Sequence, residues 1–188
     1  MNPNNYCALD IETVGGQWVN FPDGFELLMT GIRYLNEYTV YTAEPDSLKS
    51  MASFLNSFDG VTVTYNGNFF DIPILNLYCK NVLDQELSLA RHYDLLEEIK
   101  KKAGRRISLD DVASFSFGAH KVPWDHKNNR NVWANEPQLL IDYNKVDLDL
   151  TAELYERVLK GEQIFLGNAT IVLPVPDGNE EFSAGNSD

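Results

Sequence analysis

A pair of carboxylates at the end of the first apolar segment constrains the fold of this chain more than any other feature. Residues 6–11 are apolar enough to form a central strand of a sheet. Asp10 and Glu12 are two residues apart, so on a strand both side chains leave the same face. Two carboxylates held side by side repel each other strongly unless a cation lies between them. The segment therefore predicts a central strand that carries a cation-binding site.

The remaining segments alternate between strand-like and helix-like patterns. Strands are predicted where Thr, Tyr, Ile and Val are dense, and helices where apolar residues recur at helical spacing. Residues 119–134 show no clear period and are predicted to be a loop. The predicted strands are 6–11, 29–35, 38–42 and 61–65, with an edge strand over 169–175, and the predicted helices are 45–58, one beginning at Asp71, 94–104, 108–117 and a long one from 135–137 to about Lys160.

This order of elements predicts an α/β fold. Three strands, a helix, a strand and then several helices suit a central mixed β-sheet flanked by helices on its faces. A length of 188 residues is enough for one well-buried domain and too short for two comfortable ones. We expect a single domain over 1–175. The tail, residues 176–188, is polar and acidic, and we expect it to be disordered.

Two further segments place polar groups at the ends of predicted elements. Asp71 follows the strand 61–65 and begins a helix, where an isolated Asp more simply acts as an N-cap. Tyr143 and Asp147 are four residues apart, so they share one face of the longest helix, which is also its apolar face. Burying Asp147 there without a charge partner would be costly, and a metal would remove that cost. Four carboxylates and a phenol match the ligand set for two divalent cations and an oriented water, which together hydrolyse phosphodiesters.

The chemical types of these side chains indicate which cations would bind and which role the tyrosine would have. Carboxylate oxygens are preferred ligands of Mg²⁺ and Mn²⁺. A tyrosine has an ordinary pKa near 10, so Tyr143 is a poor general base at neutral pH. We therefore assign Tyr143 to hydrogen-bonding and orienting the nucleophilic water.

At this point the chain resembles a known family. Asp10-Ile-Glu12-Thr13, Asn66-Gly-Asn-Phe-Phe-Asp71 and Tyr143-Asn-Lys-Val-Asp147 resemble, in this order, the three motifs of the DEDD superfamily of 3′–5′ exonucleases, which have the ribonuclease H-like fold. The resemblance is to the subgroup with Tyr in the third motif, and it spans about residues 6–160. The second motif is also similar to that of the proofreading exonuclease domains of family B DNA polymerases.

The resemblance implies a role for each matched residue. Asp10, Glu12, Asp71 and Asp147 would bind two divalent cations, Mg²⁺ or Mn²⁺, and Tyr143 would orient the water. Thr13, Asn66 and Phe70 would contact the terminal nucleotides, although Asn66 equally suits a turn and Phe70 equally suits the core. Family B exonuclease domains lie within far longer polymerases, whereas here only a short tail follows, so we expect a free-standing nuclease or a separate subunit.

The charge distribution bears on how nucleic acid would bind. The formal net charge is −13, whereas proteins that hold nucleic acid through its phosphates usually have a basic surface. Residues 91–130 contain nine Lys and Arg against six Asp and Glu, which is a net +3. Lys121 and Trp124 combine charge and an aromatic ring in this region, and such a mix either stacks single-stranded bases or only anchors the loop. The basic cluster 100–106 either grips phosphates or ends a helix in solvent.

These observations predict a 3′–5′ exonuclease that acts on DNA, preferably single-stranded, and releases nucleoside 5′-monophosphates. An exoribonuclease is the first alternative, and a module on the same fold that binds a nucleic-acid end without cutting is the second. We expect a cytoplasmic protein without a membrane partner, because no apolar stretch approaches the roughly 20 residues that span a bilayer. Cys7 and Cys79 are expected to be buried thiols.

Overall fold

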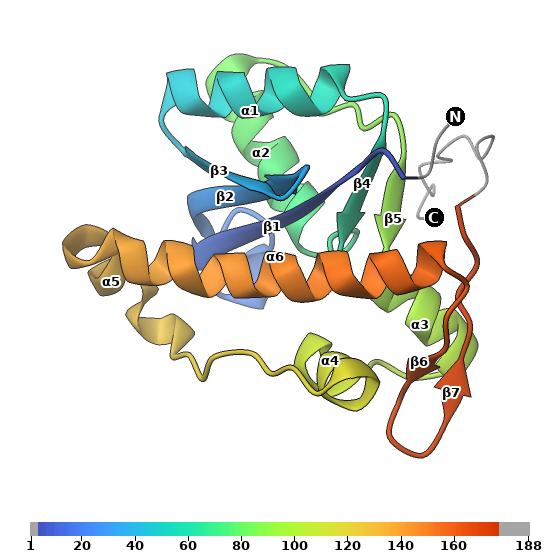
Figure 1. The fold of residues 1–188 in the computed structure, drawn as a ribbon. Helices are drawn as coiled ribbons and strands as arrows, with labels where there is room; N and C mark the ends of the chain where they lie inside the picture. The colour runs from blue at the N-terminus through green and yellow to red at the C-terminus, as the bar shows by residue number, and fades with distance from the viewer. Residues whose placement is uncertain (1–3, 177–188) are drawn as a thin grey trace.

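The structure is a computed structural model that describes residues 4–176, and its centre is a five-stranded mixed sheet (Figure 1). The strand order is β3-β2-β1-β4-β5, with β1 (Tyr6–Val14) in the middle. β1 is antiparallel to β2 (Glu26–Tyr34) and parallel to β4 (Val61–Thr64). β3 (Glu37–Thr42) and β5 (His92–Asp94) form the two edges. The predicted α/β fold with a central mixed sheet is confirmed.

Helices cover both faces of this sheet, and the alternation of side chains along β1 decides which residues face which layer. Cys7, Leu9 and Ile11 point into the core formed with α1 (Pro45–Ser57) and α2 (Asp71–Leu83). Ala8 points to the opposite face, where it packs against Leu148 and Ala152 of α6 (Pro137–Leu159). Because the side-chain period of a strand is two, Asp10 and Glu12 share the face of Ala8 and look toward α6.

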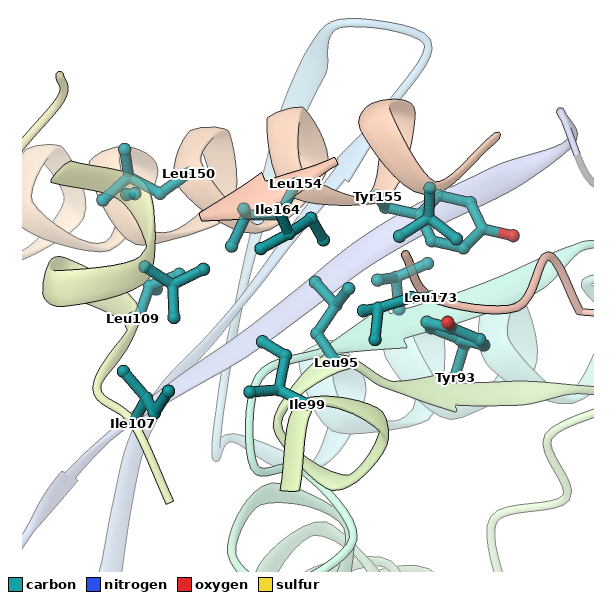
Figure 2. Packing of buried hydrophobic residues seen from close by; sticks show 14 of the residues in the cluster. Tyr93, Leu95, Ile99, Ile107, Leu109, Leu150, Leu154, Tyr155, Ile164 and Leu173 are labelled. Carbon is teal, nitrogen blue, oxygen red and sulfur yellow. The ribbon is translucent and has the colours of Figure 1, made fainter. Parts of the chain in front are cut away.

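The C-terminal half of α6 is held by a second apolar core (Figure 2). Leu150, Leu154 and Tyr155 lie against side chains from α3 (Leu95–Ala103), α4 (Leu109–Phe117) and the short hairpin that follows α6. Fully burying one Leu side chain contributes about 1.5–3 kcal/mol. This core therefore keeps α6 in one position across the sheet, and its N-terminal half lies over β1.

Helix ends follow the predicted signals. The Asp94 side chain accepts hydrogen bonds from Leu96 N–H and Glu97 N–H at the start of α3, and Ser108 accepts one from Asp111 N–H at the start of α4. Gly104 and Gly118 end these two helices in the left-handed conformation. The local chemistry of these residues therefore sets the helix boundaries.

One element was not predicted, and two predictions about the elements were wrong. The missed element is β5, a strand of only three residues, which is too short to show a pattern in the sequence. The predicted loop 119–134 contains α5 (Asn129–Asn135) and a short 3₁₀ turn, whose formation depends on contacts with β1 and α6. The predicted edge strand 169–175 is reduced to β7 (Thr170–Ile171), which pairs with β6 (Ile164–Phe165) in a separate two-stranded sheet rather than with the central one.

Cys7 and Cys79 are buried free thiols, as predicted. Over residues 4–176, no helix combines the length and the apolar character that crossing a membrane would require. The tail expected to be disordered lies, apart from Pro176, outside the described residues.

Candidate active site

Three of the predicted carboxylates meet between β1 and α6. One oxygen from each of Asp10, Glu12 and Asp147 lies within 4.8 Å of the others. Glu12 and Asp147 are buried, with 3% and 5% of their surface exposed, and Asp10 is half-buried. The strand contributes two carboxylates from its α6-facing side, and the helix contributes the third from the face that covers β1. A set of carboxylate oxygens at this separation suits a divalent cation.

The fourth predicted carboxylate, Asp71, lies beside this group of three and is tied to the central strand. It is the first residue of α2, and its Oδ1 accepts a hydrogen bond of 3.1 Å from Ile11 N–H, between Asp10 and Glu12. The N-cap of α2 is Phe70, which makes no capping hydrogen bond through its side chain. The simple helix-cap alternative for Asp71 is therefore wrong, because its side chain bonds to β1 instead.

Burial and mutual repulsion keep these acids from ionising easily. Burial, with the neighbouring charge of Asp147 next, raises the pKa of Glu12 to about 8. Burial likewise raises the pKa of Asp71 to about 7, partly offset by its hydrogen bond from Ile11. The pKa of Asp10 is well above its ordinary value because of burial and the charges of Asp71 and Asp147. Each added negative charge makes the next ionisation harder, and a bound cation would relieve that repulsion.

A lysine supplies one positive charge to the group. Lys121 Nζ is 2.6 Å from Asp147 Oδ2 and 5.4 Å from the centre of the Tyr143 ring. The other carboxylate oxygen, Asp147 Oδ1, is buried and has no hydrogen-bond donor in the described part of the chain. A buried carboxylate oxygen without a donor is costly, and a metal ion would satisfy it. The site therefore fits a divalent cation by its donor set and by this unpaired oxygen.

Two asparagines that sequence reasoning missed orient the carboxylates. Asn144 Nδ2 donates to Asp10 Oδ2 at 2.7 Å. Asn129 Nδ2 donates to Glu12 Oε2 at 3.3 Å and to the carbonyl oxygen of Thr13 at 3.0 Å. Both asparagines are only 1% exposed. Asn144 lies inside the third motif and its helical position could have drawn attention to it, whereas nothing in the sequence around Asn129 indicates its role.

Tyr143 is held in place by aromatic contacts. Its ring stacks on Trp124, with centres 4.7 Å apart and an angle of 24° between the planes. The ring of His126 is nearly perpendicular to it, with centres 5.8 Å apart and an angle of 80°. Trp124 Nε1 in turn donates to Asn129 Oδ1 at 2.7 Å, so one asparagine links this stack to Glu12. Burial raises the pKa of Tyr143 well above its ordinary value. The phenol therefore keeps its proton at neutral pH, in agreement with the prediction that Tyr143 is a poor general base.

The second motif forms a tight turn anchored by the α3 cap. Asn66 has a positive φ of 77°, and the N–H groups of Asn66 and Asn68 donate to the two oxygens of Asp94, each at 2.9 Å. Phe70 is half-buried and meets Phe25 edge to face, with ring centres 5.4 Å apart. Asn66 thus makes the turn and Phe70 contributes to the core, which were the simpler roles considered for them.

A cleft of about 410 Å³ opens from the carboxylate group toward this turn. Five residues were predicted to contact the substrate. Asn66 and Lys121 line this cleft, whereas Thr13, Phe70 and Trp124 do not. Its volume lies in the range of about 300–1,000 Å³ typical of small-ligand sites. The lining residues are Asp10, Tyr65, Asn66, Leu96, Arg106, Ile107, Ser108, Leu109, Lys121 and Asp147.

Comparison with known proteins places this geometry in a family. No curated protein matches the chain in a sequence comparison. Among solved structures, the chain is similar to the family B DNA polymerase from the hyperthermophilic archaeon Pyrobaculum calidifontis, with a TM-score of 0.66 and 22% identity over 82% of this chain. The match covers 24% of the polymerase chain, and at this identity it shows a shared fold. The family model of the RNase H superfamily matches residues 7–159, so the chain belongs to the RNase H superfamily.

Proposed function

We propose that the protein is a metal-dependent nuclease that removes nucleotides from the 3′ end of DNA, preferably single-stranded, and releases nucleoside 5′-monophosphates. The observation that carries this proposal is the meeting of Asp10, Glu12 and Asp147 between β1 and α6, with Asp71 and Tyr143 beside them. Membership of the RNase H superfamily and the fold shared with a DNA polymerase support a nucleic-acid substrate.

The four carboxylates would hold two divalent cations, Mg²⁺ or Mn²⁺. When bound, such ions lower the pKa of a water molecule and stabilise charge on the leaving oxygen. Asn144 and Asn129 keep Asp10 and Glu12 in fixed orientations through the hydrogen bonds described above. Fixed ligands need no rearrangement when a substrate phosphate arrives, which favours reaction over simple binding.

Tyr143 and Lys121 act on the substrate side of the site. The protonated Tyr143 hydroxyl donates to the attacking water and aims it, while the stacked Trp124 keeps the ring from rotating away. The Lys121 ammonium pairs with Asp147 in this structure and offers the same charge to a substrate phosphate. The contacts of Thr13, Asn66, Phe70 and Trp124 with the terminal nucleotides stay predictions, and of these four residues Asn66 lines the cleft.

The shape and charge of the molecule favour a strand end over a long duplex. The cleft beside the carboxylates has the size of a small-ligand site, and the whole chain has a net charge of −13. A duplex held over many phosphates requires a basic surface, whereas a strand end needs only a few cationic contacts.

The test is digestion of 3′-labelled single-stranded DNA and RNA oligonucleotides in Mn²⁺, repeated with a chelator. We expect release of the labelled mononucleotide, its loss with the chelator, and its loss in Asp10→Ala and Asp147→Ala. Asp142→Asn is the matched control, because it removes a carboxylate from the exposed side of the same helix. Shortening of RNA alone would replace DNA by RNA as the substrate. Metal-dependent binding of either oligonucleotide without shortening would instead support a non-cleaving module.

A further inference from the structure

An arginine outside the three motifs lines the candidate cleft. Arg106 lies on the loop between α3 and α4, and its side chain shares the cleft wall with Asp10 and Asp147. The side chain is exposed, and none of the ion pairs between described residues involves it. Lys121, the other cation of this wall, is engaged by Asp147. Arg106 is therefore the cation of the cleft that is best placed for an incoming anion.

Two contacts hold the Arg106 side chain over the turn of the second motif. Its terminal nitrogen donates to Asn66 Oδ1 at 2.7 Å, and its guanidinium carbon is 5.7 Å from the centre of the Phe69 ring. A guanidinium has five N–H donors, so a hydrogen bond to Asn66 leaves enough donors for a two-point contact with a phosphate. The contacts reduce the conformational freedom of the side chain before any ligand binds, which lowers the entropic cost of binding.

Exposed aromatic rings continue from this arginine. Phe69 is 55% exposed and Trp18 is 58% exposed, and their rings stack with centres 6.0 Å apart. Two large exposed rings beside a charged side chain form the combination that binds single-stranded nucleic acid, where bases stack and phosphates pair with cations. A strand that ran from the carboxylates past Arg106 would therefore reach the Phe69 ring.

We infer that Arg106 is a substrate-positioning residue that binds the phosphodiester next to the scissile one. This inference rests on the proposed function, in which the scissile phosphate lies at the carboxylates. The nucleotide removed from a 3′ end has no phosphate beyond the scissile one. A second phosphate in the cleft therefore belongs to the nucleotide upstream, which stays on the product strand. Arg106 binds the strand that remains after cleavage and does not contact the reacting atoms.

The experiment pairs a variant with a change in the substrate. The labelled oligonucleotide is made with either a normal or an uncharged methylphosphonate linkage at the second position from the 3′ end, and release of the 3′ nucleotide is measured. A charge-assisted contact predicts a loss of about 10-fold in kcat/KM, mainly through KM, for Arg106→Gln on the normal strand. The wild-type protein should lose the same factor on the modified strand. When Arg106→Gln acts on the modified strand, kcat/KM should fall no further than with either change alone, because both changes remove the same contact.

Controls separate a positioning role from a structural one. Arg105→Gln removes an exposed arginine one residue away and should behave like the wild-type protein on both strands. Arg106→Lys keeps the charge and should recover part of the loss, since lysine lacks the planar two-point geometry. The inference is overturned if the losses from Arg106→Gln and from the methylphosphonate multiply, or if a methylphosphonate five linkages upstream has the same effect.

Binding distinguishes failure of this inference from failure of the proposed function. The affinities of the wild-type protein and of Arg106→Gln for the normal strand and for the methylphosphonate strand are measured by fluorescence anisotropy in Ca²⁺. If the wild-type protein never cleaves but the losses in affinity still fail to multiply, the nuclease proposal is wrong and the phosphate contact stands. If cleavage occurs and the losses multiply in both assays, the nuclease proposal stands and Arg106 does not bind this phosphate.

Discussion

Gly31 of β2 makes room for the asparagine that orients Asp10, and replacing it by alanine tests this arrangement. A Cβ added at Gly31 would lie 1.8 Å from Asn144 Oδ1 and 3.0 Å from a methyl carbon of Leu148. The Asn144 amide would have to shift, and we expect this shift to disrupt its hydrogen bond to Asp10 Oδ2. Overpacking costs about 1–3 kcal/mol, and leaving a buried polar partner unsatisfied costs about 1–3 kcal/mol more. We expect Gly31→Ala to lower the free energy of unfolding by about 2–6 kcal/mol.

The assay is urea unfolding of Gly31→Ala, Asn144→Ala and the double variant in a chelating buffer. In the Asn144→Ala background the space taken by the amide is vacant, so the added methyl should cost less than about 1 kcal/mol. Gly15→Ala is the control, because its Cβ would meet nothing within 4 Å. If Gly31→Ala costs the same in both backgrounds to within about 0.5 kcal/mol, Asn144 is not the residue that requires glycine here.

Three further predictions concern metal, the aromatic stack and pH. Saturating Mn²⁺ at about 100 times its Kd should stabilise the wild-type protein and the surface variant Asp142→Asn by about 2.7 kcal/mol, and should stabilise Asp147→Asn much less, as measured by urea midpoints. Trp124→Leu removes the ring stacked on Tyr143, so kcat for nucleotide release should fall up to about 10-fold. Trp124→Phe keeps an aromatic ring, and its kcat should stay near the wild-type value. An equal loss of kcat in both variants would contradict a stacking role. Burial lowers the pKa of His92 to about 4 from an ordinary value of 6.5, so the unfolded chain binds more protons between these values. The free energy of unfolding should therefore fall as the pH decreases from 6.5 to 4, and the fall should be smaller in His92→Gln; identical pH profiles would show that His92 does not contribute.

Much of the site was predictable because its members obey local rules. Asp10 and Glu12 share a face wherever residues 6–14 form a strand, and Tyr143 and Asp147 share a face wherever residues 137–159 form a helix. Their placement on apolar elements signalled that something must compensate their charge. The caps at Asp94 and Ser108 were likewise readable, because a capping hydrogen bond spans only two or three residues.

The tertiary structure alone decided which polar groups support these carboxylates. Asn129 reaches Glu12 across 117 residues of sequence, and Asn144 reaches Asp10 across 134. Such pairings depend on how α5 and α6 lie against β1, which no local periodicity encodes. The same holds for Arg106, which reaches Asn66 only because α3 and α4 fold back toward the second motif. Local patterns determine which face of an element a side chain occupies, whereas the partner on that face is chosen by the long-range contacts of the folded chain.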